Sequence, residues 1–200
     1  MHADGVGMPT AWYLKGTLGY GIEYVPDDAP LVSFEAYSDS DWGACVDTAR
    51  STMGYAFVLA SGGVSWSSKL QPRVAASSTE AEYLGLPHAS KEVVFLRQPL
   101  SELGHDAPGP ATLLGDNQGA NTLSCDAQFH DCTRHLRLTE HFVRKQVKQG
   151  AIAVTYIPTG RMAADAMTKS LLALAFAGHR AALGVKPLRA IGDVAAEPQP

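Results

Sequence analysis

Residues 54–68 read GYAFVLASGGVSWSS. Residues 54–60 and 64–68 are two β-rich runs, and the turn residues Ser61, Gly62 and Gly63 join them. Two strands linked by a short glycine turn make an antiparallel hairpin. The stretch therefore predicts a sheet with antiparallel neighbours, around which the rest of the chain has to be placed.

A further strand is predicted immediately before this hairpin. Residues 31–37 alternate in character, with Val32, Phe34 and Ala36 on one face, and the run ends at Ser38 and Asp39. A period of two is typical of a half-buried strand. We therefore expect the first three strands to form a meander.

A long helix is predicted after the hairpin. Ser77 is followed three residues later by Glu80, which is the pattern of a capping box. Extended backwards by four residues, the apolar stripe of this helix reaches Glu82, which is therefore a candidate for chemistry. An interior proline costs about 3 kcal/mol, so we expect the helix to finish before Pro99. The stripe consists of Leu86, Ala89, Val93, Leu96 and Leu100.

Strands and helices alternate in the second half of the chain. In order, the pattern predicts a strand over residues 111–115, helices from 117 to 123 and over 133–149, a strand over 151–157, a turn over 158–161 and a final helix. The whole order is β-β-β-α-β-α-α-β-α. It predicts an α/β fold with a mixed sheet flanked by helices.

Four carboxylates lie where predicted core elements meet their ends: Asp39, Glu82, Asp116 and Asp165. A carboxylate is costly to bury unless a cation or a hydrogen-bond donor holds it. The four positions therefore suggest one metal-binding point, and Mg²⁺ is the natural partner for carboxylate oxygens. Asp41 is an alternative to Asp39, because it lies on the same face of the predicted strand.

Composition favours one globular domain, since 46% of the 200 residues are hydrophobic and 18% are charged. Neither the start of the chain nor the apolar run over residues 171–177 predicts a signal peptide or a membrane span. The three cysteines, Cys45, Cys125 and Cys132, form no CxxC pair. Their spacing favours a reduced, intracellular compartment.

Residues 130–148 are basic in an otherwise acidic chain. They carry five Lys and Arg residues against two acids, whereas the formal net charge of the whole chain is −4. Such a segment is commonly a solvated helix face. Beside a metal site it would instead bind a phosphate backbone.

Six motifs occur in one order along the chain: residues 37–42 (YSDSDW), 51–55 (STMGY), 64–66 (VSW), 77–83 (SSTEAEY), 116–118 (DNQ) and 164–169 (ADAMTK). In content and spacing they resemble the ribonuclease H domain of copia-type long-terminal-repeat retrotransposon polyproteins. The resemblance covers about residues 11–184. It implies a ribonuclease H-like fold with a five-stranded mixed sheet flanked by helices.

The resemblance also implies an activity and a set of site residues. It implies an endoribonuclease that degrades the RNA strand of an RNA/DNA hybrid by two-metal-ion hydrolysis, with two Mg²⁺ ions or, alternatively, Mn²⁺. The catalytic residues and metal ligands would be Asp39, Glu82, Asp116 and Asp165. Candidate nucleic-acid contacts are Asn117, Gln118, Arg134, Arg137, Arg144 and Lys145. For Asn117 and Gln118, capping of a helix is an equal alternative.

The resemblance suggests how the chain is divided. Residues 1–30 would be a remnant of the connection segment of a reverse transcriptase, residues 31–185 the ribonuclease H domain, and residues 186–200 a flexible tail. The partners would be the hybrid and the reverse transcriptase domain of the same polyprotein, in a cytoplasmic particle or the nucleus. An inactive relic that folds and binds nucleic acid is the alternative, because Pro87 lies one turn after Glu82.

Overall fold

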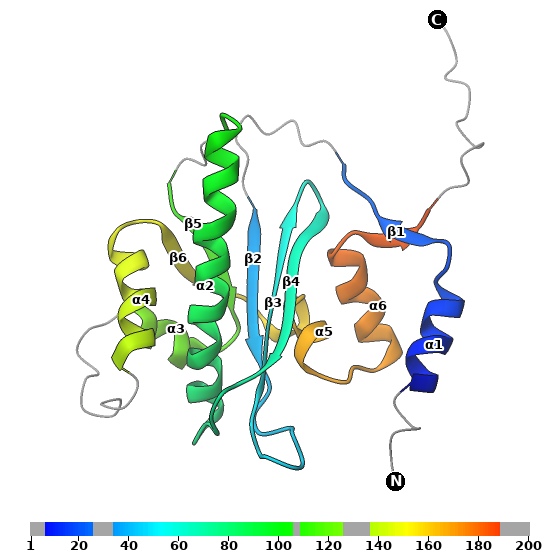
Figure 1. Cartoon of the computed structure of the whole chain (residues 1–200), viewed down its shortest axis with the longest axis horizontal. Helices are drawn as coiled ribbons and strands as arrows, with labels where there is room; N and C mark the ends of the chain where they lie inside the picture. Colours follow the sequence, from blue (N-terminus) through cyan, green and yellow to red (C-terminus); the bar gives the residue numbers. More distant parts are fainter. Residues whose placement is uncertain (1–6, 26–33, 106–108, 126–136, 189–200) are drawn as a thin grey trace, which may run out of the picture.

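A five-stranded mixed sheet forms the centre of the computed structural model (Figure 1), which describes residues 7–25, 34–105, 109–125 and 137–188. The strand order is β4-β3-β2-β5-β6. The first three strands pair antiparallel, while β5 pairs parallel with both β2 and β6. The strands are β2 (Glu35–Ser40), β3 (Thr52–Leu59), β4 (Gly62–Leu70), β5 (Ala111–Gly115) and β6 (Ile152–Tyr156). The meander and the mixed sheet predicted from the sequence are both confirmed.

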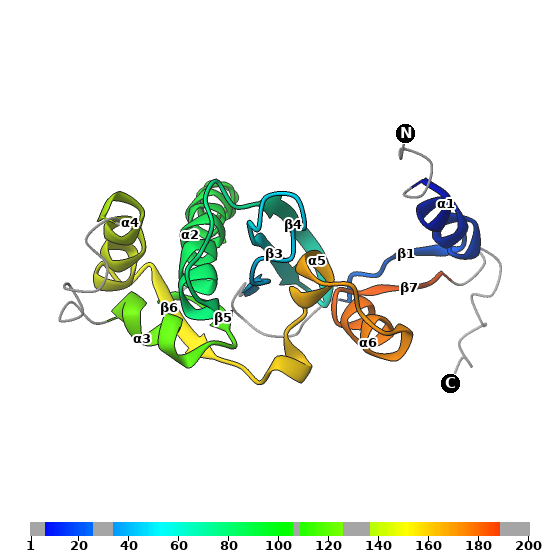
Figure 2. The ribbon, with the colours of Figure 1, turned by 90° about the horizontal axis from the view of Figure 1, so that it is seen from below.

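Helices cover both faces of this sheet (Figure 2). On one face, α2 (Ser78–Glu102), α3 (Gln118–Cys125) and α4 (Arg137–Lys148) enclose a core centred on Phe57, Leu113 and Val93. On the other face, residues 162–164 and the short helix α5 (Asp165–Thr168) pack with Tyr37, Ala56 and Val58. Both faces of β2 and β3 are therefore buried.

The β3–β4 hairpin turns at a different place from the one predicted. Leu59 pairs with Gly62, so the loop consists of Ala60 and Ser61, whose φ angles are 49° and 63°. This is the left-handed pair that a two-residue hairpin loop requires. The glycines begin β4 instead. A Cβ on Gly62 would come within 2.6 Å of the Tyr24 ring, so the glycine lets the N-terminal segment approach the hairpin.

Helix α2 begins as predicted but continues further. The Ser77 side chain accepts a hydrogen bond from the Glu80 backbone N–H at 3.1 Å, and Glu80 Oε2 accepts one from the Ala76 N–H at 2.8 Å. The predicted end before Pro99 is wrong, because the helix runs through both prolines to Glu102. The Pro99 carbonyl still accepts the Leu103 N–H, so the last turn closes without the missing proline donor.

A small second sheet joins the two ends of the described chain. Strand β1 (Tyr20–Ile22) pairs antiparallel with β7 (Val185–Pro187), and the helices α1 (Gly7–Gly16) and α6 (Ala173–Ala182) flank them. Backbone hydrogen bonds from Val25 to Ala60 and from Gly63 to Leu183 attach this sheet to the hairpin. The first two residues of the expected tail, Lys186 and Pro187, thus belong to β7.

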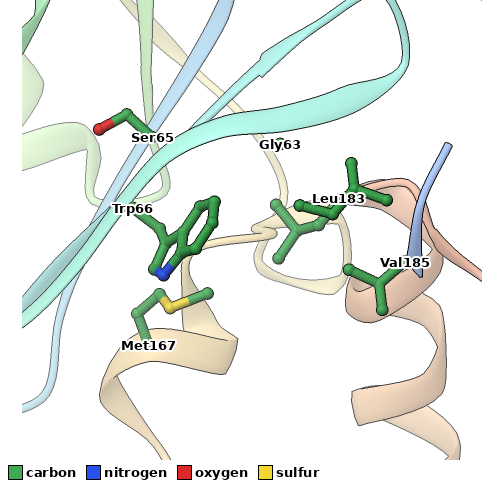
Figure 3. Close-up of a pocket in the computed structure, with 7 residues that line it drawn as sticks. Gly63, Ser65, Trp66, Met167, Leu183 and Val185 are labelled. Carbon is green, nitrogen blue, oxygen red and sulfur yellow. The ribbon is translucent and has the colours of Figure 1, made fainter. Parts of the chain in front are cut away.

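An apolar junction lies where the small sheet meets β4 and α5 (Figure 3). It leaves a cavity of about 120 Å³ lined by Ile22, Gly63, Ser65, Trp66, Met167, Leu183 and Val185. Met167 belongs to α5, so the junction anchors the helix that carries Asp165. In the described ranges, no helix is both long and apolar enough to cross a membrane.

Candidate active site

Three of the four predicted carboxylates converge. One ligand atom each from Asp39, Glu82 and Asp116 lies within 4.8 Å of the others. Asp39 comes from β2, Glu82 from the start of α2, and Asp116 directly follows β5. The parallel register pairs Tyr37 with Leu114, so continuing it by two residues places Asp39 opposite Asp116.

The structure corrects where Asp39 lies in its strand. We expected the strand over residues 31–37 to end at Ser38 and Asp39, whereas β2 runs from Glu35 to Ser40 and includes Asp39. Asp39 is 0% exposed. A carboxylate this deep in a sheet requires cationic or hydrogen-bonding partners.

Lys169 and Thr168 supply those partners and connect the fourth carboxylate. The Lys169 ammonium contacts Asp39 Oδ1 at 3.0 Å and Asp165 Oδ1 at 2.9 Å. The Thr168 hydroxyl donates to Asp39 Oδ2. Asp165 therefore joins the cluster through a shared lysine. The structure thus brings Asp39, Glu82 and Asp116 together directly, and it connects Asp165 to Asp39 only through Lys169.

Gly54 is the residue that lets α5 approach the sheet. It pairs with Asp39 across the β2–β3 ladder. A Cβ on Gly54 would lie 2.7 Å from Met167 Cβ and 2.9 Å from Thr168 Cγ2. Glycine at this position is therefore needed for Thr168 to reach Asp39.

The electrostatics of the cluster favour a bound cation. Burial, together with the nearby negative charges of Asp39 and Asp116, raises the pKa of Glu82 to about 9. Burial also raises the pKa of Asp165, against the lowering effect of Lys169. Burial lowers the pKa of Lys169, but Asp39 and Asp165 outweigh it and leave the pKa raised. A divalent cation would relieve the repulsion between these carboxylates. Carboxylate oxygens are hard ligands of the kind that Mg²⁺ and Mn²⁺ prefer.

Asp41, the alternative to Asp39, has a different role. Its two carboxylate oxygens accept the backbone N–H groups of Ala44 at 3.1 Å and Thr52 at 3.0 Å. These bonds fix the loop after β2. Among the described residues, the acidic cluster contains Asp39 and not Asp41.

Two of the candidate nucleic-acid contacts lie beside Asp116. The Asn117 Oδ1 atom accepts the Ala120 N–H at 3.0 Å, so Asn117 caps α3 as the capping alternative predicted. Gln118 is exposed at the first position of that helix. Thr159, which the sequence did not indicate, donates to Asp116 Oδ2 at 2.7 Å.

The basic candidates near the end of α4 lie at the opposite end of the strands from Asp116. Ala111 donates its N–H to the Ala151 carbonyl, so the end of α4 lies where β5 and β6 begin, whereas Asp116 follows the end of β5. Arg144, Lys145, Lys148 and Gln149 line a surface depression there. Arg144 also donates to the Leu123 carbonyl of α3 at 3.2 Å. Arg134 and the side chain of Arg137 lie outside the described residues.

The roles of Thr168 and Lys169 were missed, although both belong to the ADAMTK motif. The signal was the spacing of Asp165 and Lys169, because residues four apart on a helix are neighbours. Nothing local to the motif predicts that the lysine also reaches Asp39, which is 130 residues away along the chain.

The amino-acid sequence was compared with those of known proteins. No protein-family model matches the chain. It is 39% identical over 173 residues, 86% of its length, to the retrovirus-related Pol polyprotein from transposon RE2 of Arabidopsis thaliana, and 35% identical over 158 residues, 78% of its length, to that from transposon TNT 1-94 of Nicotiana tabacum. The chain spans 12% of the length of each polyprotein.

A solved structure of RNase H1 from Halobacterium salinarum aligns with 68% of this chain and 94% of its own, at 20% identity and a TM-score of 0.45. The sheet topology and the acidic cluster define a ribonuclease H-like domain. The chain is homologous to a segment of the Pol polyproteins of copia-type retrotransposons, as its six motifs predicted.

Proposed function

We propose that this domain is an endoribonuclease that cuts the RNA strand of an RNA/DNA hybrid with the help of two divalent ions. The observation that carries the proposal is the convergence of Asp39, Glu82 and Asp116 within 4.8 Å, with Asp165 joined to them through Lys169. The homology to Pol polyproteins supports the same activity, since reverse transcription leaves a hybrid whose RNA strand has to be removed.

The four carboxylates that would hold the ions come from β2, from α2, from the residue after β5 and from the short helix α5. Bound Mg²⁺ or Mn²⁺ would activate the attacking water and stabilise the leaving 3′ oxygen. Asp39, buried in β2, would be a central ligand, because it lies close to Glu82 and Asp116 and shares Lys169 with Asp165. Thr168 and Thr159 orient Asp39 and Asp116 by donating to their carboxylates.

The residues around the cluster suggest how the substrate is held. Gln118 is exposed two residues after Asp116 and would donate to a 2′-hydroxyl, the group that distinguishes RNA from DNA. The exposed lysines of α4, Lys145 and Lys148, would bind phosphates further along the same duplex. In the parent polyprotein we expect a reverse transcriptase domain as the partner, within a cytoplasmic particle or the nucleus.

A cleavage assay tests this proposal. The purified chain is given an RNA/DNA hybrid labelled on the RNA strand, with duplex DNA and duplex RNA as matched controls. We expect cleavage of the RNA strand of the hybrid in Mg²⁺, none in EDTA, and none of duplex DNA. A folded chain that binds the hybrid and cuts nothing in either Mg²⁺ or Mn²⁺ would establish the inactive relic instead.

A further inference from the structure

Lys169 lies inside the acidic cluster in a way that the proposed reaction does not require. Its ammonium touches one oxygen of Asp39 and one of Asp165, at 3.0 Å and 2.9 Å. Asp39 and Asp165 are 0% and 7% exposed at their side chains, whereas Lys169 is 34% exposed. The lysine therefore enters a buried acidic site from the solvent side.

The oxygens that Lys169 contacts are those that a metal ion shared by Asp39 and Asp165 would need. The second oxygen of Asp39 already accepts the Thr168 hydroxyl. An ammonium and a divalent ion on the same two carboxylates would repel each other at short range in a poorly hydrated site. Both cations cannot bind there at full strength.

Lys169 lies after the last residue of helix α5, and its side chain is partly exposed. Lys169 follows α5 in an extended conformation, with φ −130° and ψ 148°. Helix α5 itself is fixed by Met167 in the apolar junction and by the close approach of Gly54. Because the lysine stem is partly exposed, its ammonium can move into solvent while Asp165 stays in place.

We propose that Lys169 is a built-in competitor of the divalent ion on the Asp39–Asp165 side of the cluster. The inference rests on the proposed function only in taking these carboxylates as metal ligands. Lys169 holds Asp39 and Asp165 together when the metal concentration is low, and it lowers the affinity of the site for metal. It is a positioning residue that sets the metal concentration at which the domain becomes loaded.

Mn²⁺ binding, measured by calorimetry without nucleic acid, tests this competition. Lys169→Met removes the charge and keeps most of the apolar stem, and we expect it to bind Mn²⁺ at least about tenfold more tightly than wild type. Lys169→Arg keeps the charge and should bind Mn²⁺ as wild type does. Lys186→Met is the matched control. Lys186 lies on β7 and forms a surface ion pair with Glu23, so its loss should leave Mn²⁺ binding unchanged.

The wild-type chain gives a second measurement in case Lys169→Met does not fold. With ¹³C-labelled lysine, Mg²⁺ should shift the Cε resonance of Lys169 and leave that of Lys186 in place. Unchanged or weaker Mn²⁺ affinity in Lys169→Met, or a Lys169 resonance indifferent to Mg²⁺, would overturn the inference. Neither readout depends on cleavage, so a chain that cuts no hybrid but shows the tenfold gain would refute the proposed activity alone.

Discussion

Gly54 lies directly opposite Asp39 in the β2–β3 ladder. Because Gly54 has no side chain, Met167 and Thr168 pack closely against its backbone. The position of α5, and with it the positions of Asp165 and Lys169, thus depends on one glycine in β3. This dependence can be tested without changing a charged residue.

Gly54→Ala should displace α5 from the sheet. The added Cβ would lie within 3.0 Å of Met167 Cβ and Thr168 Cγ2, and overpacking of this kind costs about 1–3 kcal/mol. We expect a lower free energy of unfolding in urea and a loss of hybrid cleavage. Gly178→Ala is the control, because that position in α6 is exposed and has open space around it. Alanine in place of glycine within a helix should raise the free energy of unfolding by about 0.5–1 kcal/mol. Equal stability of the two variants would show that α5 does not need the glycine.

Metal should stabilise the chain more at high pH than at low pH. The pKa of Glu82 is raised, so the folded chain keeps a proton that the unfolded chain releases. In EDTA, the stability contributed by this group is present below the ordinary glutamate pKa and is lost as pH rises from about 4 towards about 9. Bound metal should favour the ionised form and remove this loss.

Thermal unfolding in EDTA and in Mg²⁺ across that pH range measures the effect. The gain in melting temperature caused by Mg²⁺ should increase with pH in the wild type. Glu82→Gln is uncharged at every pH, so in EDTA its stability should fall less steeply over the same range. If stability in EDTA falls with pH equally steeply in the variant and the wild type, a group other than Glu82 causes the pH dependence.

The lysines of α4 should contribute salt-dependent affinity and not catalysis. Replacing both Lys145 and Lys148 by Ala should reduce the slope of log affinity against log salt by about 2 for a catalytically silenced chain on a long hybrid. The paired control replaces Lys15 and Lys91, which are exposed on α1 and α2. Arg144 is left intact, since its bond to the Leu123 carbonyl joins α4 to α3. An unchanged slope would make the α4 surface an ordinary solvated face.

The sequence correctly predicted those elements that are determined by residues close together in the chain. The hairpin, the capping box at Ser77 and the strand β5 each depend on residues close together in the chain, and each is present. The ends of β2 and α2 were misplaced for physical reasons. Both faces of β2 are buried, so alternation does not mark where it stops, and tertiary packing carries α2 past Pro99.

The parts that the sequence could not predict depend on long-range contacts. Strands β1 and β7 have three residues each and pair across most of the chain, with Gly21 opposite Lys186. The expected final helix is two helices, α5 and α6, with Lys169 in the extended segment between them. The four acids could be predicted from their positions beside core elements, but the bond from Lys169 to Asp39 could not.

The most direct measurement of the central claim is hybrid cleavage by three chains in Mg²⁺: wild type, Asp39→Asn and Asp41→Asn. The two variants make the same chemical change two residues apart, but only Asp39 lies in the acidic cluster of the described residues. We expect Asp39→Asn to lose more than about 100-fold in rate, since even supporting residues of metal sites cost 10–100-fold, while Asp41→Asn keeps most of the activity. Equal rates for wild type and Asp39→Asn, or no cleavage by the folded wild-type chain, would contradict the account.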